Sequence, residues 1–117
     1  MVRAPRPLFA IIALIVIAVD QFFKYFIPHL EYPITFGFLS IRLAHNTGAG
    51  FGLLQGYTWL LALISLIVAG AVIVFYKLIP KDRQTQIMWA LFFGGVVGNL
   101  LDRLFRGYVI DFIDFGF

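Results

Sequence analysis

Charged side chains inside an apolar run are the first residues of this chain that could do chemistry. Asp20 and Lys24 lie four residues apart within such a run, so they share one face if the run is a helix. We expect them to pair, because a lone charge in an apolar span is costly. Two interpretations stay open: a structural ion pair whose lysine reaches the lipid headgroups, or a direct part in function.

A second group of polar residues follows the last apolar run. Asn99 and Asp102 are three residues apart and share a helix face, with Arg103 next in the chain. A structural alternative is that Asp102 pairs with Arg103 or caps the turn. Asp111 and Asp114 then stand among Val, Ile and Phe. Desolvation there is expected to raise the pKa of a carboxyl group and keep it protonated near neutrality, as general acid–base work at a peptide bond requires.

An asparagine among glycines lies in the middle of the chain, in the segment His45-Asn46-Thr47-Gly48-Ala49-Gly50-Phe51-Gly52. Such a sequence is most often a turn. The functional alternative is that Asn46 donates its amide to a substrate carbonyl or to a carboxylate. Glycines such as Gly48 would then let a peptide come near.

The composition indicates a membrane protein. Of 117 residues, 62% are hydrophobic and 13% charged, and the mean hydropathy is +0.94, whereas soluble domains are usually about 45–50% apolar. The net charge of +3 is scattered, so no nucleic-acid surface is predicted. Cysteine is absent, which excludes disulfides, thiolate metal sites and a cysteine nucleophile. The two histidines fit no metal-ligand spacing, and we predict neither metal nor cofactor.

Three apolar runs are predicted to span a membrane, at about residues 8–27, 57–76 and 84–101. Residues 28–56 contain prolines, glycines and partial alternation, which predicts short strands in a small sheet on the membrane surface. Residues 77–83 form a polar loop. The predicted fold is one membrane domain, residues 1–117: an all-α bundle of three spans with a small extracytoplasmic β-sheet between spans one and two.

The positions of the cations predict the orientation. Cytoplasmic flanks carry an excess of Lys and Arg, which places residues 28–56 and the C-terminal tail outside. The first run continues into bulky residues with no small-residue cleavage site, so we expect it to be retained. Five cations support this orientation: Arg3, Arg6, Lys77, Lys81 and Arg83. Three oppose it: Arg42, Arg103 and Arg106.

Four blocks, taken in order, resemble those of the lipoprotein signal peptidase family, also called signal peptidase II. They are residues 20–24, 46–51, 94–103 and 107–112. Gly50 stands where the family usually has an alanine. The resemblance implies four helices and an extracytoplasmic sheet. It also implies two aspartates at the outer membrane surface that cleave prolipoproteins just before their lipid-modified cysteine.

The resemblance also implies roles for particular residues. Asp111 occupies the place of the first catalytic aspartate. Other residues match positions that shape or support the site: Asn46, Gly48, Asn99, Asp102, Arg103, Asp20, Lys24 and Asp114.

The second catalytic aspartate of the family stands in an Asn-x-Ala-Asp block at the start of a fourth helix. The 117 residues contain no such block. Two carboxylates that share one proton divide the labour, because the ionised one activates water while the protonated one polarises the scissile carbonyl. We therefore expect these 117 residues alone to be inactive. Asp114 and Asp102 are geometric candidates for the missing partner, but the resemblance gives neither that role.

The sequence therefore predicts an aspartic endopeptidase of the bacterial cytoplasmic membrane, with its active site on the extracytoplasmic face. Its partners would be membrane lipids and a prolipoprotein signal peptide next to a lipidated cysteine. One alternative is a pseudo-peptidase that binds lipidated peptides without cutting them. A less favoured alternative is a small transporter or channel that uses Asp20 and Lys24 as an ion relay. The sequence predicts no oligomeric state.

Overall fold

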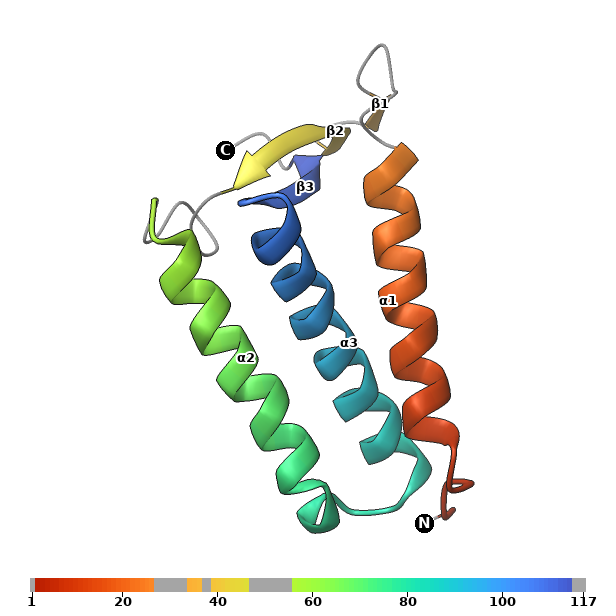
Figure 1. The fold of residues 1–117 in the computed structure, drawn as a ribbon. Helices are drawn as coiled ribbons and strands as arrows, with labels where there is room; N and C mark the ends of the chain where they lie inside the picture. Colours follow the sequence, from red (N-terminus) through yellow and green to blue (C-terminus); the bar gives the residue numbers. More distant parts are fainter. Residues whose placement is uncertain (1, 27–33, 37–38, 47–55, 115–117) are drawn as a thin grey trace.

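Three helices lie side by side with a small sheet at one end (Figure 1). The computed structural model describes residues 2–26, 34–36, 39–46 and 56–114. Within them the α-helices are α1 (Leu8–Phe26), α2 (Thr58–Val74) and α3 (Arg83–Phe105). A short 3-10 helix, η3 (Tyr76–Leu78), lies between α2 and α3. The N-terminus and η3 lie at the end away from the sheet, and α3 packs against both other helices.

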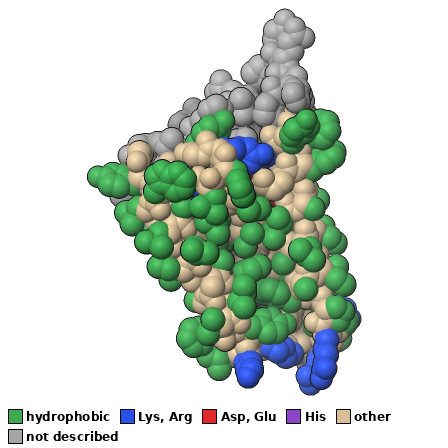
Figure 2. All heavy atoms as spheres, in the orientation of Figure 1, with side chains coloured by type: hydrophobic (Ala, Val, Ile, Leu, Met, Phe, Trp, Pro, Cys, Tyr) green, Lys and Arg blue, Asp and Glu red, His purple; other side chains and the backbone are tan. Residues whose placement is uncertain are grey.

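The helices are apolar along their outer surfaces as well as where they touch. Large hydrophobic side chains such as Leu14, Ile67 and Met88 are exposed on α1, α2 and α3, and Figure 2 shows such side chains along the length of the bundle. Crossing a hydrocarbon core of roughly 30 Å takes about 20 helical residues. By length and composition α1 and α3 meet this requirement, while α2, with 17 residues, is shorter. The apolar helices fit a membrane protein.

Helix α3 extends four residues beyond the predicted end at residue 101, so Asp102 and Arg103 belong to the helix. Its last turn closes on the Asp102 carbonyl oxygen, which accepts from the backbone N–H groups of Arg106 at 2.7 Å and Gly107 at 3.1 Å. Gly107 has a φ of 82°, the left-handed conformation that ends helices and that glycine adopts without strain. The prediction stopped too early because it followed the apolar run, whereas the helix continues into paired polar residues.

The sheet is antiparallel in the order β1-β2-β3, with β1 at Ile34–Phe36, β2 at Leu39–Asn46 and β3 at Val109–Asp114. The central strand pairs with β1 through Ile34 and Ile41, and with β3 through Ala44 and Asp111. Strand β3 comes from after α3, in the C-terminal tail, whereas the sequence analysis expected the sheet to be formed between spans one and two. Pairing between strands so far apart in the chain has no local sequence signal.

Glycines let α1 and α3 approach closely. A Cβ atom built on Gly94 would lie 2.7 Å from Val16 Cγ1 and 3.2 Å from the Ala13 carbonyl oxygen, whereas one on Gly95 would meet nothing within 4 Å. A Cβ atom on Gly98 would overlap the Asp20 carboxylate. Small residues at helix interfaces allow such contact in lipid, so these glycines set the spacing at which polar groups of the two helices meet.

We expect Gly94→Ala to destabilise the bundle by about 1–3 kcal/mol, because the added methyl group must displace Val16 or the backbone of α1. The matched control is Gly95→Ala, which adds the same methyl group into open space. It should be neutral or stabilise by up to about 1 kcal/mol, since alanine favours helix more than glycine. Unfolding in detergent, followed by circular dichroism, measures both. Equal losses in the two variants would contradict close packing at Gly94.

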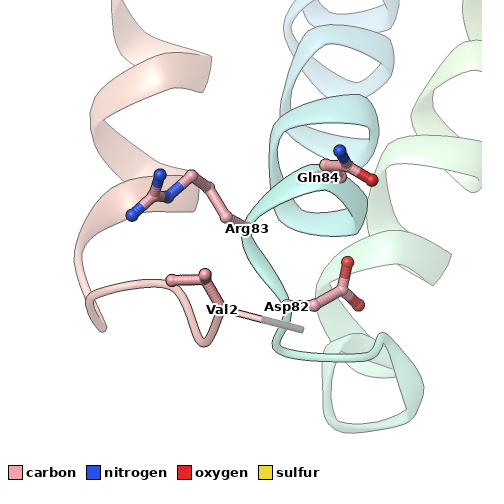
Figure 3. A pocket seen from close by; sticks show the side chains of 4 residues that line it. All are labelled: Val2, Asp82, Arg83 and Gln84. Atoms are coloured by element: carbon pink, nitrogen blue, oxygen red, sulfur yellow. The ribbon is translucent and has the colours of Figure 1, made fainter.

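The opposite end of the bundle is fastened by backbone hydrogen bonds to the N-terminal segment. The N–H of Ala4 donates to the Lys81 carbonyl oxygen at 2.8 Å. The N–H of Arg83 donates to the Val2 carbonyl oxygen, also at 2.8 Å. Asp82 caps α3, because its Oδ2 accepts from the backbone N–H of Thr85 at 3.0 Å and from the Thr85 hydroxyl at 2.8 Å. Figure 3 shows Val2 beside this turn, with the Asp82 and Arg83 side chains pointing to opposite sides.

The cap makes stability depend on pH. The hydrogen bonds from the Thr85 backbone and hydroxyl hold the pKa of Asp82 below its ordinary value of 3.8. The ionised cap therefore stabilises the fold fully above that ordinary value, and this contribution is lost as the pH falls through the lower folded-state pKa. Asn also caps helices but does not titrate. We expect the advantage of the native protein over Asp82→Asn to shrink between about pH 5 and pH 2. Thermal unfolding of both proteins at several pH values measures this. A difference in melting temperature that stayed constant from about pH 5 to pH 2 would disprove the prediction.

Candidate active site

A cluster of polar side chains joins α1 to α3 near the sheet. Helix α1 contributes Asp20, Gln21 and Lys24, α3 contributes Asn99 and Asp102, and Arg106 follows as the C-terminal cap of α3. Spacings of four and three residues put Asp20 and Gln21 on the side of α1 that Lys24 shares, and spacings of three and four align the other three residues. We call these six residues the polar cluster. The two faces can meet because the helices approach closely at Gly94 and Gly98.

Lys24 lies at the centre of the polar cluster. Its Nζ is 2.9 Å from Asp20 Oδ2, 2.8 Å from Asp102 Oδ2 and 3.2 Å from Asn99 Oδ1. An ammonium group has three N–H donors, and here each has an acceptor. The predicted pairing of Asp20 with Lys24 is confirmed. The idea that Lys24 reaches the headgroups is wrong, because its side chain is only 2% exposed and is held by the second carboxylate.

The Asp102 carboxylate is completely buried, with 0% of its side chain exposed. Its Oδ2 binds Lys24, and its Oδ1 accepts from Arg106 Nη1 at 2.7 Å and from Gln21 Nε2 at 3.1 Å. Asp102 and Asp20 supply two negative charges, and Lys24 and Arg106 supply two positive charges. The cluster is therefore neutral as a unit, which lowers the cost of burying its charges.

Gln21 and Arg106 are site residues that the sequence analysis missed. Gln21 Nε2 lies 3.0 Å from Asp20 Oδ2 and 3.1 Å from the Gly98 carbonyl oxygen, while its Oε1 accepts from Arg106 Nη1 at 3.0 Å. One signal was present in the sequence: an amide next to Asp20 in an apolar run, on the face that Lys24 shares. No comparable signal marked Arg106, which the sequence analysis counted only as a cation opposing the predicted orientation.

Arg103 ties the end of α3 to α2. It is nearly buried, and its Nη1 donates to Ser65 Oγ at 3.2 Å. Together with the polar cluster, this contact holds the last turns of α3 against both other helices. The chain leaves that end through Gly107 and enters β3 at Val109.

Strands β2 and β3 carry the remaining predicted site residues of the described chain. The backbone of Asp111 pairs with Ala44, and that of Asn46 pairs with Val109. Asn46 and Asp111 are thus brought to neighbouring strands. Asp114 is in the same strand as Asp111 and not in a helical turn, so a helical arrangement of these two aspartates is excluded. The structure does not describe the side chains of these strand residues, and Gly48 lies outside the described residues.

At this end of the bundle, the paired side chains of the polar cluster lie near β3, the strand that bears Asp111 (Figure 1). Within the residues described, no group of three or more His, Cys, Asp or Glu side chains is placed to hold a metal ion. The acids of the polar cluster form ion pairs with Lys24 and Arg106, and these contacts join the end of α3 to α1. Asp111 follows that end by way of a single glycine turn.

A comparison with known families settles the relationship. The sequence model described as Signal peptidase (SPase) II matches residues 12–117. The chain belongs to the signal peptidase II family. That match includes the whole polar cluster as well as Asp111. Signal peptidase II is a family of peptidases, and the matched residues include β3, which bears Asp111.

Individual relatives agree with the signal peptidase II assignment. The lipoprotein signal peptidase of Moorella thermoacetica is 39% identical over 112 residues, covering 91% of this chain and 75% of the relative. That of Bacillus pumilus is 40% identical over 113 residues, covering 92% and 73%. These relatives are therefore longer than the present chain.

Solved structures show the same fold. A bacterial membrane enzyme solved at 2.3 Å has a TM-score of 0.84 and 30% identity, over 97% of this chain and 73% of that one. A second, solved at 1.9 Å, has a TM-score of 0.79 and 30% identity, over 97% and 77%. The signal peptidase II fold of this chain therefore resembles that of solved membrane enzymes.

Proposed function

We propose that this protein is a membrane-embedded aspartic endopeptidase that removes signal peptides from lipid-modified prolipoproteins, cutting before the diacylglyceryl cysteine. Membership of signal peptidase II and the names of the relatives support this activity. The observation that carries the proposal is the position of Asp111. It lies on β3, paired with β2, directly after the helix end that the polar cluster fixes.

In this proposal Asp111 is the first catalytic aspartate. Its partner is the aspartate of an Asn-x-Ala-Asp block, which the 117 residues do not contain. The ionised carboxylate takes a proton from water, and the protonated one polarises the scissile carbonyl. The water oxygen bonds to the carbonyl carbon, and the leaving nitrogen takes a proton as the C–N bond breaks. One carboxylate cannot hold both protonation states at once, so the proposed mechanism needs a second carboxylate beside Asp111.

The other site residues are proposed to support this chemistry. Asp20, Lys24, Asn99 and Asp102 hold α1 and α3 together beneath the sheet. Arg103 holds α3 to α2 through Ser65. Three more residues are proposed to contact or frame the substrate from the strands and the following loop: Asn46, Gly48 and Asp114.

We further propose that α1, α2 and α3 are all spans of the bacterial cytoplasmic membrane, with the sheet on the extracytoplasmic side. Support comes from the distribution of charge. Lys and Arg side chains stand out at the end of the bundle opposite the sheet, although others are visible near the sheet (Figure 2). Cations concentrate on cytoplasmic flanks. Asp111 would then act at the outer membrane surface, where a lipid-modified precursor presents its signal peptide.

A cleavage assay tests the function. A chain that continues through an Asn-x-Ala-Asp block would be reconstituted in lipid with a diacylglyceryl-modified precursor and, in parallel, with the unmodified precursor. We expect a shortened product, identified by mass spectrometry, from the modified precursor only. Failure to cut it, or equal cutting of both precursors, would overturn the proposal. Precursor binding without cleavage by such a chain would favour the pseudo-peptidase.

A further inference from the structure

A cavity lies at the end of the bundle away from the sheet, remote from the polar cluster. It has a volume of about 390 Å³, within the range of roughly 300–1,000 Å³ typical of small-molecule sites. Arg3 and Arg6 line it from the N-terminal segment, Tyr76 and Lys81 from the connection between α2 and α3, and Gln86 from the first turn of α3. Nothing in the proposed peptidase chemistry uses these residues.

Among the residues that the structure describes, three cations and no carboxylate line this cavity, which we call the basic cavity. The side chains of Arg3 and Arg6 are exposed, and neither guanidinium group pairs with a carboxylate in the described part of the chain. This differs from the polar cluster, where each cation has an acid. The basic cavity thus carries positive charge that an anion would neutralise.

Part of the basic cavity is held rigidly before any ligand arrives. Lys81 Nζ donates to the carbonyl oxygens of Tyr76 at 2.9 Å and Ile79 at 2.6 Å, and lies 4.1 Å from the centre of the Tyr76 ring. Gln86 is 2% exposed and is fixed by the Tyr76 hydroxyl and by the Pro80 carbonyl oxygen. Lys81 keeps one N–H and its charge for a ligand. Such preorganisation reduces the entropy that binding would cost.

The neighbouring smaller cavity offers a contrast. It has a volume of about 180 Å³ and is lined by Val2, Asp82, Arg83 and Gln84 (Figure 3). The Asp82 carboxylate would repel an anion there. Of these two cavities, only the basic cavity has the charge to hold one.

The surroundings of the basic cavity indicate that the anion comes from lipid. Leu78, in the same connection as Tyr76 and Lys81, is 78% exposed, and Phe75 beside it is also exposed. Large apolar side chains next to cations are typical of the boundary between hydrocarbon and headgroups. Arg6 likewise stands two residues before Leu8, where the apolar helix α1 begins. The anions concentrated at that level of a bilayer are lipid phosphates.

We propose that the basic cavity binds the phosphate-bearing headgroup of an anionic phospholipid, with Arg3 and Arg6 closing on the phosphate from the N-terminal segment and Lys81 contacting it from the helix connection. Binding does not depend on the proposed peptidase activity. The choice of leaflet rests on the proposed orientation, which places this end of the bundle, and therefore the lipid, in the cytoplasmic leaflet.

Native mass spectrometry of the whole chain, in mixed micelles of phosphatidylglycerol and phosphatidylcholine at equal concentrations, tests this. We expect one phosphatidylglycerol to be retained at least about tenfold more often than phosphatidylcholine. Arg3→Gln with Arg6→Gln should weaken phosphatidylglycerol binding about tenfold. Each of the two cations is expected to contribute about threefold to the affinity for a lipid phosphate, and the two factors multiply. The matched control, Lys77→Gln with Arg83→Gln, removes the same charge from the same end outside the basic cavity and should change binding less than about twofold.

Three results would overturn the proposal: equal weakening by the control pair, equal retention of the two lipids, or displacement of phosphatidylglycerol by an equal concentration of inorganic phosphate. The first would indicate general surface attraction, and the last a site for free phosphate. Helix content by circular dichroism checks that each variant folds. Should the Arg3 and Arg6 pair fail that check, Arg6→Gln alone is the test variant, with an expected loss of about threefold.

Discussion

Asp111→Asn is expected to lower the rate of prolipoprotein cleavage by about a thousandfold or more, in a chain that also carries the Asn-x-Ala-Asp block. An amide of the same shape can neither take a proton from water nor exchange one with a second carboxylate, and such acid–base steps contribute about 10²- to 10⁴-fold each. Single-turnover release of the signal peptide from a lipid-modified precursor measures the loss. Binding of the precursor should change far less, because shape and most hydrogen-bonding capacity persist.

Two further variants make the Asp111 result specific. Asp82→Asn removes a carboxylate at the opposite end of the bundle while keeping a helix cap, and should leave the rate within about twofold. Asp114→Asn, in the same strand as Asp111, should reduce the rate by only about tenfold if Asp114 supports the site without sharing the proton. A larger loss at Asp114 than at Asp111 would show that Asp114 is the catalytic acid and that the assignment is wrong.

Asp102→Asn is expected to destabilise the bundle by about 3–5 kcal/mol, the usual cost of leaving a buried charge without its partner. Asp102 is completely buried and is an ionic partner of both Lys24 and Arg106. The amide would leave Lys24 beside a single carboxylate, Asp20, and would give the cluster a net positive charge. Thermal unfolding in detergent, together with protease resistance of the helices, measures the effect.

The double variant Lys24→Met with Asp102→Asn tests whether this cost comes from charge. It leaves Asp20 and Arg106, so the remaining cluster is neutral again. The double variant should therefore be more stable than the sum of the single losses predicts, by at least about 1 kcal/mol. Arg106→Gln should cost only about 1 kcal/mol, because that side chain is 27% exposed and water can replace part of its contacts. If the stability losses of Lys24→Met and Asp102→Asn simply added up in the double variant, an ionic role for the cluster would be refuted.

The helices were largely predictable because their signal is local. The expected runs at residues 8–27 and 84–101 became α1 (Leu8–Phe26) and α3 (Arg83–Phe105). The run at 57–76 became a shorter helix, Thr58–Val74, followed by the 3-10 turn η3. Length and apolar content are sufficient for such predictions. They do not fix a boundary where polar side chains find partners, as Asp102 does.

The sequence by itself determined the apolar helices, the pairing of Asp20 with Lys24 through their spacing, and the family blocks that mark Asp111. Only the tertiary structure decided that Lys24 also binds Asp102, that Gln21 and Arg106 complete the neutral cluster, and that β3 pairs with β2. The physical reason is that periodicity and i, i+4 pairing act within one turn of one helix. Which helix faces meet depends instead on close approach at residues such as Gly94 and Gly98, between segments about 80 residues apart in the chain.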